Sequence, residues 1–142
     1  MNNAIEISPY DANDESEVIA LWNACGLVTH TNDPRKDINR KLEVDRNLFL
    51  VGRNQNAVVA TVMGGYEGHR GWINYLAVAP LERRKGYGQK MMAAVEGLIG
   101  KKGCPKINLQ VRAANEDVIE FYKALGYRVD DVIGLGERLK VD

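Results

Sequence analysis

The chain has 142 residues, with 19 basic and 19 acidic side chains and a formal net charge of zero. This length suits one domain with its own hydrophobic core, so we expect a single domain over residues 1–142. The balanced charge argues against a dedicated nucleic-acid or membrane-surface binder, and the sequence holds no apolar run long enough to cross a bilayer.

The first third of the chain predicts one strand and two helices. Residues 4–8 alternate apolar and polar side chains, which is typical of a strand. Asp14, with Glu17 three residues later, predicts a capping box at the start of the first helix. Asp33 predicts the N-cap of the second helix, because Pro34 follows it at the position where proline fits best.

The rest of the chain mixes β-forming runs with two amphipathic helices. The predicted elements are a hairpin over 47–53 and 57–66, a strand over 72–79, a helix over 87–99, a strand over 106–112, a helix from Asn115 to Leu125, and strands over 127–133 and 136–141. This order predicts a three-layer α/β fold, in which a mixed, mostly antiparallel sheet has helices on both faces.

A basic, glycine-containing turn joins the strand over 72–79 to the helix that follows. The first amides of a helix have no internal partner and carry partial positive charge, so they attract anions. Gly86 and Gly88 have no Cβ, so a phosphate can approach the backbone closely, and Arg83, Arg84 and Lys85 add positive charge. The turn predicts a pyrophosphate site, although an ordinary solvated turn has the same residue types.

Two motifs give the sequence a family resemblance. The stretch "LAVAPLERRKGYGQKMMAAVE" resembles the acetyl-CoA-binding core of GNAT-superfamily N-acetyltransferases, whose signature is matched by Arg83, Gly86 and Gly88. A second family element, an Asn-capped helix that ends in "FYKALGY", is matched by Asn115, Phe121, Tyr122, Leu125, Gly126 and Tyr127. "MGGYEGHRG" and "KGCPKI" further resemble the small bacterial YpeA-type subgroup.

The resemblance implies how acetyl-CoA binds as co-substrate. Amides of residues 84–89 would hold the pyrophosphate, and the strand before the turn would face the pantetheine arm. A β-bulge would open a slot between the fourth and fifth strands, and the Val78 N–H would polarise the acetyl carbonyl. The cofactor-binding residues so implied are Leu76, Ala77, Val78, Arg83, Arg84, Lys85, Gly86, Tyr87, Gly88, Gln89 and Asn115.

The resemblance also implies the catalytic groups. Tyr122 occupies the position of a family tyrosine near the coenzyme sulfur, which implies a general acid; ring packing alone would also explain it. The general base stays open, because the fourth strand offers Asn74 and Tyr75 but no carboxylate. Glu67 is the carboxylate that we select, with His69 or water as alternatives and a solvated hairpin tip as the competing explanation.

His30 lies in the predicted loop between the first two helices and borders the family's usual acceptor site. A loop residue without a catalytic task is the simpler explanation for it.

The implied function is transfer of an acetyl group from acetyl-CoA to a primary amine of a small molecule or a protein. Two other classes stay open. The same fold would serve as a non-catalytic acyl-CoA sensor, which the lack of an obvious base favours. A nucleic-acid binder would use the basic turn, but balanced charge and the lack of an aromatic platform argue against it.

The sequence offers fewer clues about compartment and assembly. Cys25 and Cys104 lack metal-ligand spacing and are expected to be reduced thiols, so we predict no metal site and a cytoplasmic protein. No partner beyond acetyl-CoA and an amine is predicted, neither nucleic acid nor membrane, and a homodimer is left open.

Overall fold

The computed structural model describes residues 4–142. The chain divides into two compact units, one up to Leu109 and one from Gln110 onward. The first unit contains β1 (Glu6–Pro9), α1 (Glu15–Ala24), α2 (Pro34–Val44), β2 (Phe49–Asn54), β3 (Ala57–Tyr66), β4 (Gly71–Val78), α3 (Tyr87–Lys101) and β5 (Ile107–Leu109). The second contains α4 (Glu116–Ala124). That the two units form one domain stays a prediction.

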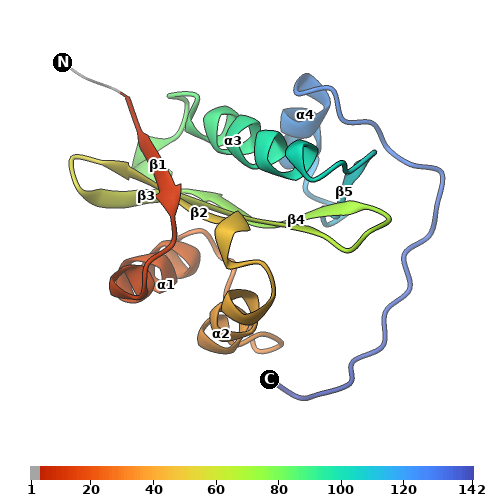
Figure 1. The fold of residues 1–142 in the computed structure, drawn as a ribbon, viewed down its shortest axis with the longest axis horizontal. Coiled ribbons are helices and arrows are strands. Elements are labelled where there is room, and N and C mark those ends of the chain that lie inside the picture. Colours follow the sequence, from red (N-terminus) through yellow and green to blue (C-terminus); the bar gives the residue numbers. More distant parts are fainter. Residues whose placement is uncertain (1–3) are drawn as a thin grey trace. The chain divides into compact units, whose positions relative to one another are not determined.

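The first unit is a five-stranded sheet with helices on both faces. The strands lie in the order β1-β2-β3-β4-β5, with antiparallel pairs except for the parallel pair β4–β5. Helices α1 and α2 lie on one face and α3 on the other (Figure 1). The predicted three-layer arrangement with a mixed, mostly antiparallel sheet is therefore confirmed.

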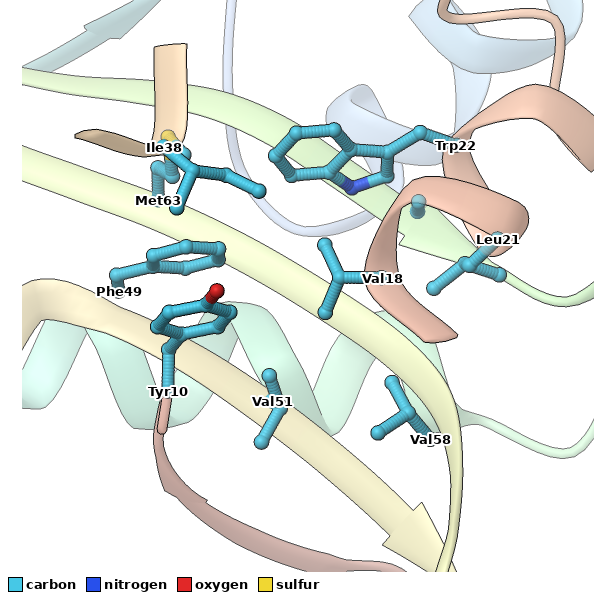
Figure 2. Packing of buried hydrophobic residues seen from close by; sticks show 10 residues of the cluster. Tyr10, Val18, Leu21, Trp22, Ile38, Phe49, Val51, Val58 and Met63 are labelled. Carbon is cyan, nitrogen blue, oxygen red and sulfur yellow. The ribbon is translucent and has the colours of Figure 1, made fainter. Parts of the chain in front are cut away.

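The core between the sheet and the first two helices is built from aromatic side chains. Tyr10 and Phe49 stack with ring centroids 4.5 Å apart, and Trp22 lies beside Phe49 at 6.1 Å (Figure 2). Trp22 and Phe49 are fully buried, and burying a large apolar side chain contributes about 1.5–3 kcal/mol. The packing fixes α1 against the sheet.

A glycine fixes α3 against the opposite face. A Cβ on Gly64 of β3 would lie 2.5 Å from Cγ2 of Val95 and 2.9 Å from Cδ1 of Ile99, both in α3. Only glycine lets the helix approach the strand this closely. This contact holds the C-terminal half of α3 against β3.

Several local signals have the predicted effect. Asp33 caps α2, because its carboxylate accepts hydrogen bonds from the amides of Arg35 and Lys36. Gln55 and Asn56 form the β2–β3 turn with φ values of 51° and 69°, the left-handed conformations that a tight hairpin turn requires.

The predicted capping box at Asp14 and Glu17 is wrong. Asp11 and Asp14 form the box, one turn earlier, around a short 3-10 helix that precedes α1. The Asp14 carboxylate is also bound to Arg53, and the Glu17 carboxylate accepts from the Val58 amide at 2.9 Å. Tertiary partners in β2 and β3 therefore take up the carboxylates that the local pattern assigned to the helix.

The C-terminal strand predictions are also corrected. β5 ends at Leu109, three residues before the predicted end, and neither 127–133 nor 136–141 forms a strand. A strand needs a ladder partner, and these segments have their large apolar side chains in solvent. The exposed fractions are Val129 77%, Val132 78%, Ile133 88%, Leu135 95%, Leu139 90% and Val141 91%.

Candidate functional site

The turn before α3 leaves the start of the helix without a side-chain cap. Gly86 occupies the N-cap position with φ 79° and ψ 13°, and as a glycine it makes no side-chain cap hydrogen bond to the first turn. Arg84 also has a positive φ, 67°. Gly86, Gln89 and the three basic residues before Gly86 are exposed. This arrangement suits an anion, because helix N-termini carry partial positive charge.

Two of the three basic side chains make contacts near the turn. Lys85 Nζ lies 2.6 Å from the Glu82 carboxylate, and this hydrogen bond raises the pKa of the lysine. Arg83 Nε donates to the Val78 carbonyl at 3.3 Å, and one Nη atom lies 3.6 Å from Sγ of Cys25. The turn is thereby tied back to the end of β4.

Tyr87, the first residue of α3, is buried behind the turn. Its side chain is 1% exposed, and its hydroxyl accepts a hydrogen bond from Nδ2 of Asn54 at 3.1 Å. The ring therefore anchors the first turn of α3 in the core.

The predicted β-bulge lies in β4. Met63 pairs with Asn74 and Thr61 with Ala77, so two steps along β3 face three steps along β4. Tyr75, inside the extra step, has φ 52°. One inserted residue with a left-handed backbone is the signature of a bulge.

After the bulge, each residue of β4 has its side chain on the opposite face of the sheet and its N–H toward the opposite edge. Before it, Ile73 pairs with Gly64 on the α3 side of the sheet; after it, Ala77 packs in the cluster around Trp22 on the α1 side. The Ala79 amide donates to Val59 of β3 at 2.8 Å. Because amides alternate between edges along a strand, the Val78 N–H points away from β3.

The Val78 N–H points to the edge of β4 that faces β5, and β5 does not extend that far along β4. β5 pairs with β4 only from Gly71 to Ile73, opposite Ile107 to Leu109. In the described part of the sheet, β4 from Asn74 onward is paired with β3 alone. The predicted separation of the fourth and fifth strands therefore begins directly before the bulge.

The two base candidates of the hairpin tip lie at the other end of β4. The Glu67 carboxylate accepts hydrogen bonds from the amides of His69 and Arg70, and the Arg70 and His69 amides together lower its pKa. The tip is exposed. At about 3.3 Å per residue, the strand places the tip on the order of 20 Å from Val78. These contacts are those of a turn residue and weaken Glu67 as a base.

The loop between α1 and α2 holds His30, which is exposed. The same loop is closed by Asn32, whose amide nitrogen donates to the Leu27 carbonyl at 3.0 Å and to the Tyr75 hydroxyl at 2.7 Å. The structure therefore joins this loop to the bulge through Asn32 rather than through His30.

The second unit holds the remaining predicted residues. The Asn115 side chain caps α4 by accepting from the Val118 amide at 3.4 Å. Tyr122 is 9% exposed, with edge contacts to the rings of Phe121 and Tyr127. Burial raises its pKa to about 12, so the phenol keeps its proton at neutral pH. A protonated phenol can donate a proton and cannot accept one as a base.

Sequence reasoning missed the side chains behind the bulge. The sequence offers Tyr75 only as a strand residue without a carboxylate, and no pattern in it predicts a role for Trp22 at the bulge. Thr61, fully buried, joins them through hydrogen bonds. Local sequence carries no signal for this cluster, because its members come from three different elements.

Comparison with known proteins identifies the class. The model of the acetyltransferase (GNAT) family matches residues 15–127. An acetyltransferase of Yersinia enterocolitica is 45% identical over 138 residues, 97% of this chain and 98% of the relative. An acetyltransferase of Sodalis glossinidius is 45% identical over 139 residues, with the same shares covered. The chain belongs to the GNAT family and is an acyltransferase.

Solved structures share the fold. The PaiA N-acetyltransferase of Thermoplasma acidophilum, in complex with coenzyme A, has a TM-score of 0.78 at 20% identity, covering 92% of this chain and 94% of its own. The aminoglycoside N-acetyltransferase AAC(6')-Iy, in complex with a bisubstrate analogue, has 0.77 at 17% identity, covering 95% and 99%. These likenesses confirm the predicted fold. Across residues 4–142, none of the helices has the length and apolar character needed to cross a membrane.

Proposed function

We propose that this protein transfers an acetyl group from acetyl-CoA to a primary amine by direct attack in a ternary complex. The observation that carries the proposal is the uncapped start of α3 directly after the bulged, unpaired end of β4. One element suits a pyrophosphate, and the other presents backbone amides beside it in the chain. Together they match what acyl transfer from a nucleotide thioester needs.

The residues of the turn fit the coenzyme. The amides of residues 84–89 would hold the pyrophosphate, helped by Arg83, Arg84 and Lys85. Gly86, Tyr87, Gly88 and Gln89 would contribute their backbone. On β4, Leu76, Ala77 and Val78 would bind the pantetheine arm through their backbone. Asn115 was predicted to contact the coenzyme, but we assign it the role of helix cap, because its side chain already accepts from the Val118 amide of α4.

In the proposed reaction, the protein transfers protons and stabilises the charge that forms on the carbonyl oxygen. The amine nitrogen bonds to the acetyl carbon, the carbon–sulfur bond breaks, and the nitrogen loses one proton while the thiolate gains one. The Val78 N–H, which points to the unpaired edge, would stabilise charge on the carbonyl oxygen. Tyr122 would supply the proton to sulfur, a role that its family position supports and that its protonated state at neutral pH allows.

Three candidates exist for the group that accepts the proton of the amine: Glu67, His69 and water. Glu67 is the predicted carboxylate, but its hydrogen bonds within its own turn favour His69 or a water molecule instead. Holding amine and thioester together lowers the barrier by up to roughly 7–11 kcal/mol, so a weak base suffices for a neutral amine.

The acceptor, the YpeA-type subgroup, the cytoplasmic location and the homodimer stay predictions. AAC(6')-Iy, an aminoglycoside N-acetyltransferase solved with a bisubstrate analogue, suggests that small amines belong in a first panel of acceptors. Amino acids and peptides with a free N-terminus or a lysine complete the panel.

A non-catalytic acyl-CoA sensor is the second candidate. The observation in its favour is that β4 carries no carboxylate and that Glu67 is occupied by the hairpin tip. Such a sensor would bind acetyl-CoA without releasing free thiol.

Thiol release from acetyl-CoA, measured across the amine panel, separates the two candidates. Wild type should release thiol with at least one amine, and Tyr122→Phe should lower kcat about 100-fold, the usual loss for a missing proton donor. Tyr127→Phe is the matched control, because it removes a hydroxyl from a neighbouring ring of the same unit and should leave kcat unchanged. Binding of acetyl-CoA without thiol release would support the sensor, and no binding would overturn both.

A further inference from the structure

A buried chain of hydrogen bonds holds the bulge of β4 from behind. Nε1 of Trp22 donates to Oγ1 of Thr61 at 2.9 Å, and Oγ1 of Thr61 donates to the backbone carbonyl of Tyr75 at 2.9 Å. Trp22 and Thr61 are 0% exposed. The threonine hydroxyl therefore uses its one proton and one lone pair to join α1 to the bulge through β3.

The Tyr75 side chain holds the same bulge from the other direction. Its ring stacks on Trp22 with centroids 3.8 Å apart and planes 13° from parallel. Its hydroxyl donates to Oδ2 of Asp37 at 2.6 Å and accepts from Nδ2 of Asn32 at 2.7 Å. The residue is thus tied to α1, to α2 and to the loop between them.

The backbone of Tyr75 needs this support. Its φ of 52° is uncommon for a residue with a bulky side chain, and such conformations persist only where the surroundings determine them. Most bulges use glycine or a small polar residue at such a position. A tyrosine here makes sense when the ring and the hydroxyl do a task that glycine does not.

The bulge decides what Val78 presents to the unpaired edge. Because one extra residue reverses the alternation along a strand, a β4 without the bulge would turn the Val78 N–H toward β3 and the Ala77 N–H outward. The bulge thus selects the amide that addresses the edge left by β5.

We propose that Thr61 and Tyr75 are positioning residues for acyl transfer: with Trp22 they lock the β4 bulge and so direct the Val78 N–H at the acetyl carbonyl. This inference rests on the proposed function. It also gives the loop over 27–32 a mechanical link to the reacting group, because Asn32 binds the Tyr75 hydroxyl. Neither residue touches the substrate in this account.

The test compares Thr61→Val with Thr61→Ser in the full chain. Valine keeps the shape but loses both hydrogen bonds, and we expect kcat to fall about 10-fold, less than for outright loss of an oxyanion donor. KM for acetyl-CoA should stay within about twofold, because the pyrophosphate turn is a separate element. Serine keeps the hydroxyl and should restore kcat to within about twofold of wild type.

A control separates positioning from general loss of stability. Ile99→Ala makes a cavity at the far end of α3, where Ile99 is fully buried against the sheet. This variant should lower the melting temperature at least as much as Thr61→Val but leave kcat unchanged. An equal fall of kcat in both variants would overturn the positioning role.

Two substitutions of Tyr75 provide a second, independent test. Tyr75→Phe keeps the stacked ring and loses the hydroxyl; Tyr75→Gly suits the backbone conformation and loses the whole anchor. We expect kcat to fall about threefold for phenylalanine and about 10-fold or more for glycine, in line with the number of contacts removed. Full activity of Tyr75→Gly would show that the backbone conformation alone suffices and would contradict the inference.

The outcomes distinguish failure of the proposed function from failure of the positioning role alone. Wild type without transfer to any amine overturns the proposed function and this inference with it. Wild-type transfer with undiminished kcat in Thr61→Val overturns the inference alone.

Discussion

The two halves of the candidate site are built by opposite means. The turn over 83–89 is exposed, and the start of α3 has no side-chain cap, so its binding groups are backbone amides. The bulge at Tyr75 is held by side chains from α1, α2 and β3, of which Trp22 and Thr61 are fully buried. We call the turn over 83–89 the open element, because its backbone can bind a ligand. We call the bulge at Tyr75 the closed element, because side chains of other elements fix its conformation.

The difference teaches where each element is vulnerable. A site made of amides tolerates changes of neighbouring side chains but not an added Cβ or a negative charge. A strained backbone held by side chains fails when one of those side chains loses its hydrogen bond. The following predictions test this contrast, beginning with the largest expected effect.

The closed element should respond most strongly to Thr61→Val. The substitution leaves the Trp22 indole N–H and the Tyr75 carbonyl buried without partners, each at about 1–3 kcal/mol. We expect the free energy of unfolding to fall by about 2–4 kcal/mol in urea denaturation. Thr61→Ser is the control and should lose much less. If Thr61→Val lost less free energy of unfolding than Thr61→Ser, the hydrogen bonds of Thr61 would not be what holds the bulge.

The buried tyrosines should make the protein lose stability at high pH. Burial raises the pKa of Tyr122 from 10 to about 12, and burial also raises the pKa of Tyr75. The unfolded chain therefore loses these protons first. The contribution of these two tyrosines is fully present below pH 10 and is lost as the pH rises above 10; for Tyr122 the loss runs to about pH 12, at no more than about 1.4 kcal/mol per pH unit.

Thermal unfolding measured from pH 8 to 12 checks this expectation. Tyr75→Phe should make the alkaline loss shallower, whereas substitutions in the basic turn should not. A stability that rises between pH 10 and 12 would contradict the assigned burial.

The open element should respond to Gly86→Ala. Gly86 has φ 79°, and the added methyl group meets no atom within 4 Å, so the cost is purely conformational. That cost is about 1 kcal/mol, which corresponds to about a fivefold loss of acetyl-CoA affinity if the turn relaxes. Calorimetric titration measures it, with Gly97→Ala, where an added Cβ also meets nothing, as the control inside α3. Stronger binding by Gly86→Ala would be the opposite result.

The smallest effect is expected at the hairpin tip. Glu67→Gln should lower kcat less than about threefold, because its carboxylate is bound to its own turn and a water molecule or His69 can take the proton. Steady-state kinetics with His69→Ala alongside provides the comparison. A fall of about 100-fold in Glu67→Gln would restore Glu67 as the general base.

Sequence predicted the open element far better than the closed one. The role of the turn follows from local signals, namely Gly86, Gly88 and three basic residues between a strand and a helix. The hydrogen bonds of Thr61 join residues 39 and 14 positions away in the chain, and nothing in the local pattern announces them. The bulge itself was expected from the family, but not the tyrosine that holds it.

The errors have the same origin. Asp14 and Glu17 have the spacing of a capping box, but Arg53 and the Val58 amide bind their carboxylates instead. The segments over 127–133 and 136–141 have the alternation of strands, yet no strand forms where the side chains stay in solvent. Local pattern fails wherever a distant partner, or the lack of one, decides the outcome.

The central claim is that main-chain amides at the start of α3 bind the pyrophosphate of acetyl-CoA. Calorimetric titration of acetyl-CoA into wild type and Gly88→Glu tests it directly. We predict micromolar affinity for wild type and no detectable binding for Gly88→Glu, because the new carboxylate occupies the anion site and repels the phosphates. Equal affinity in the two proteins would contradict the claim.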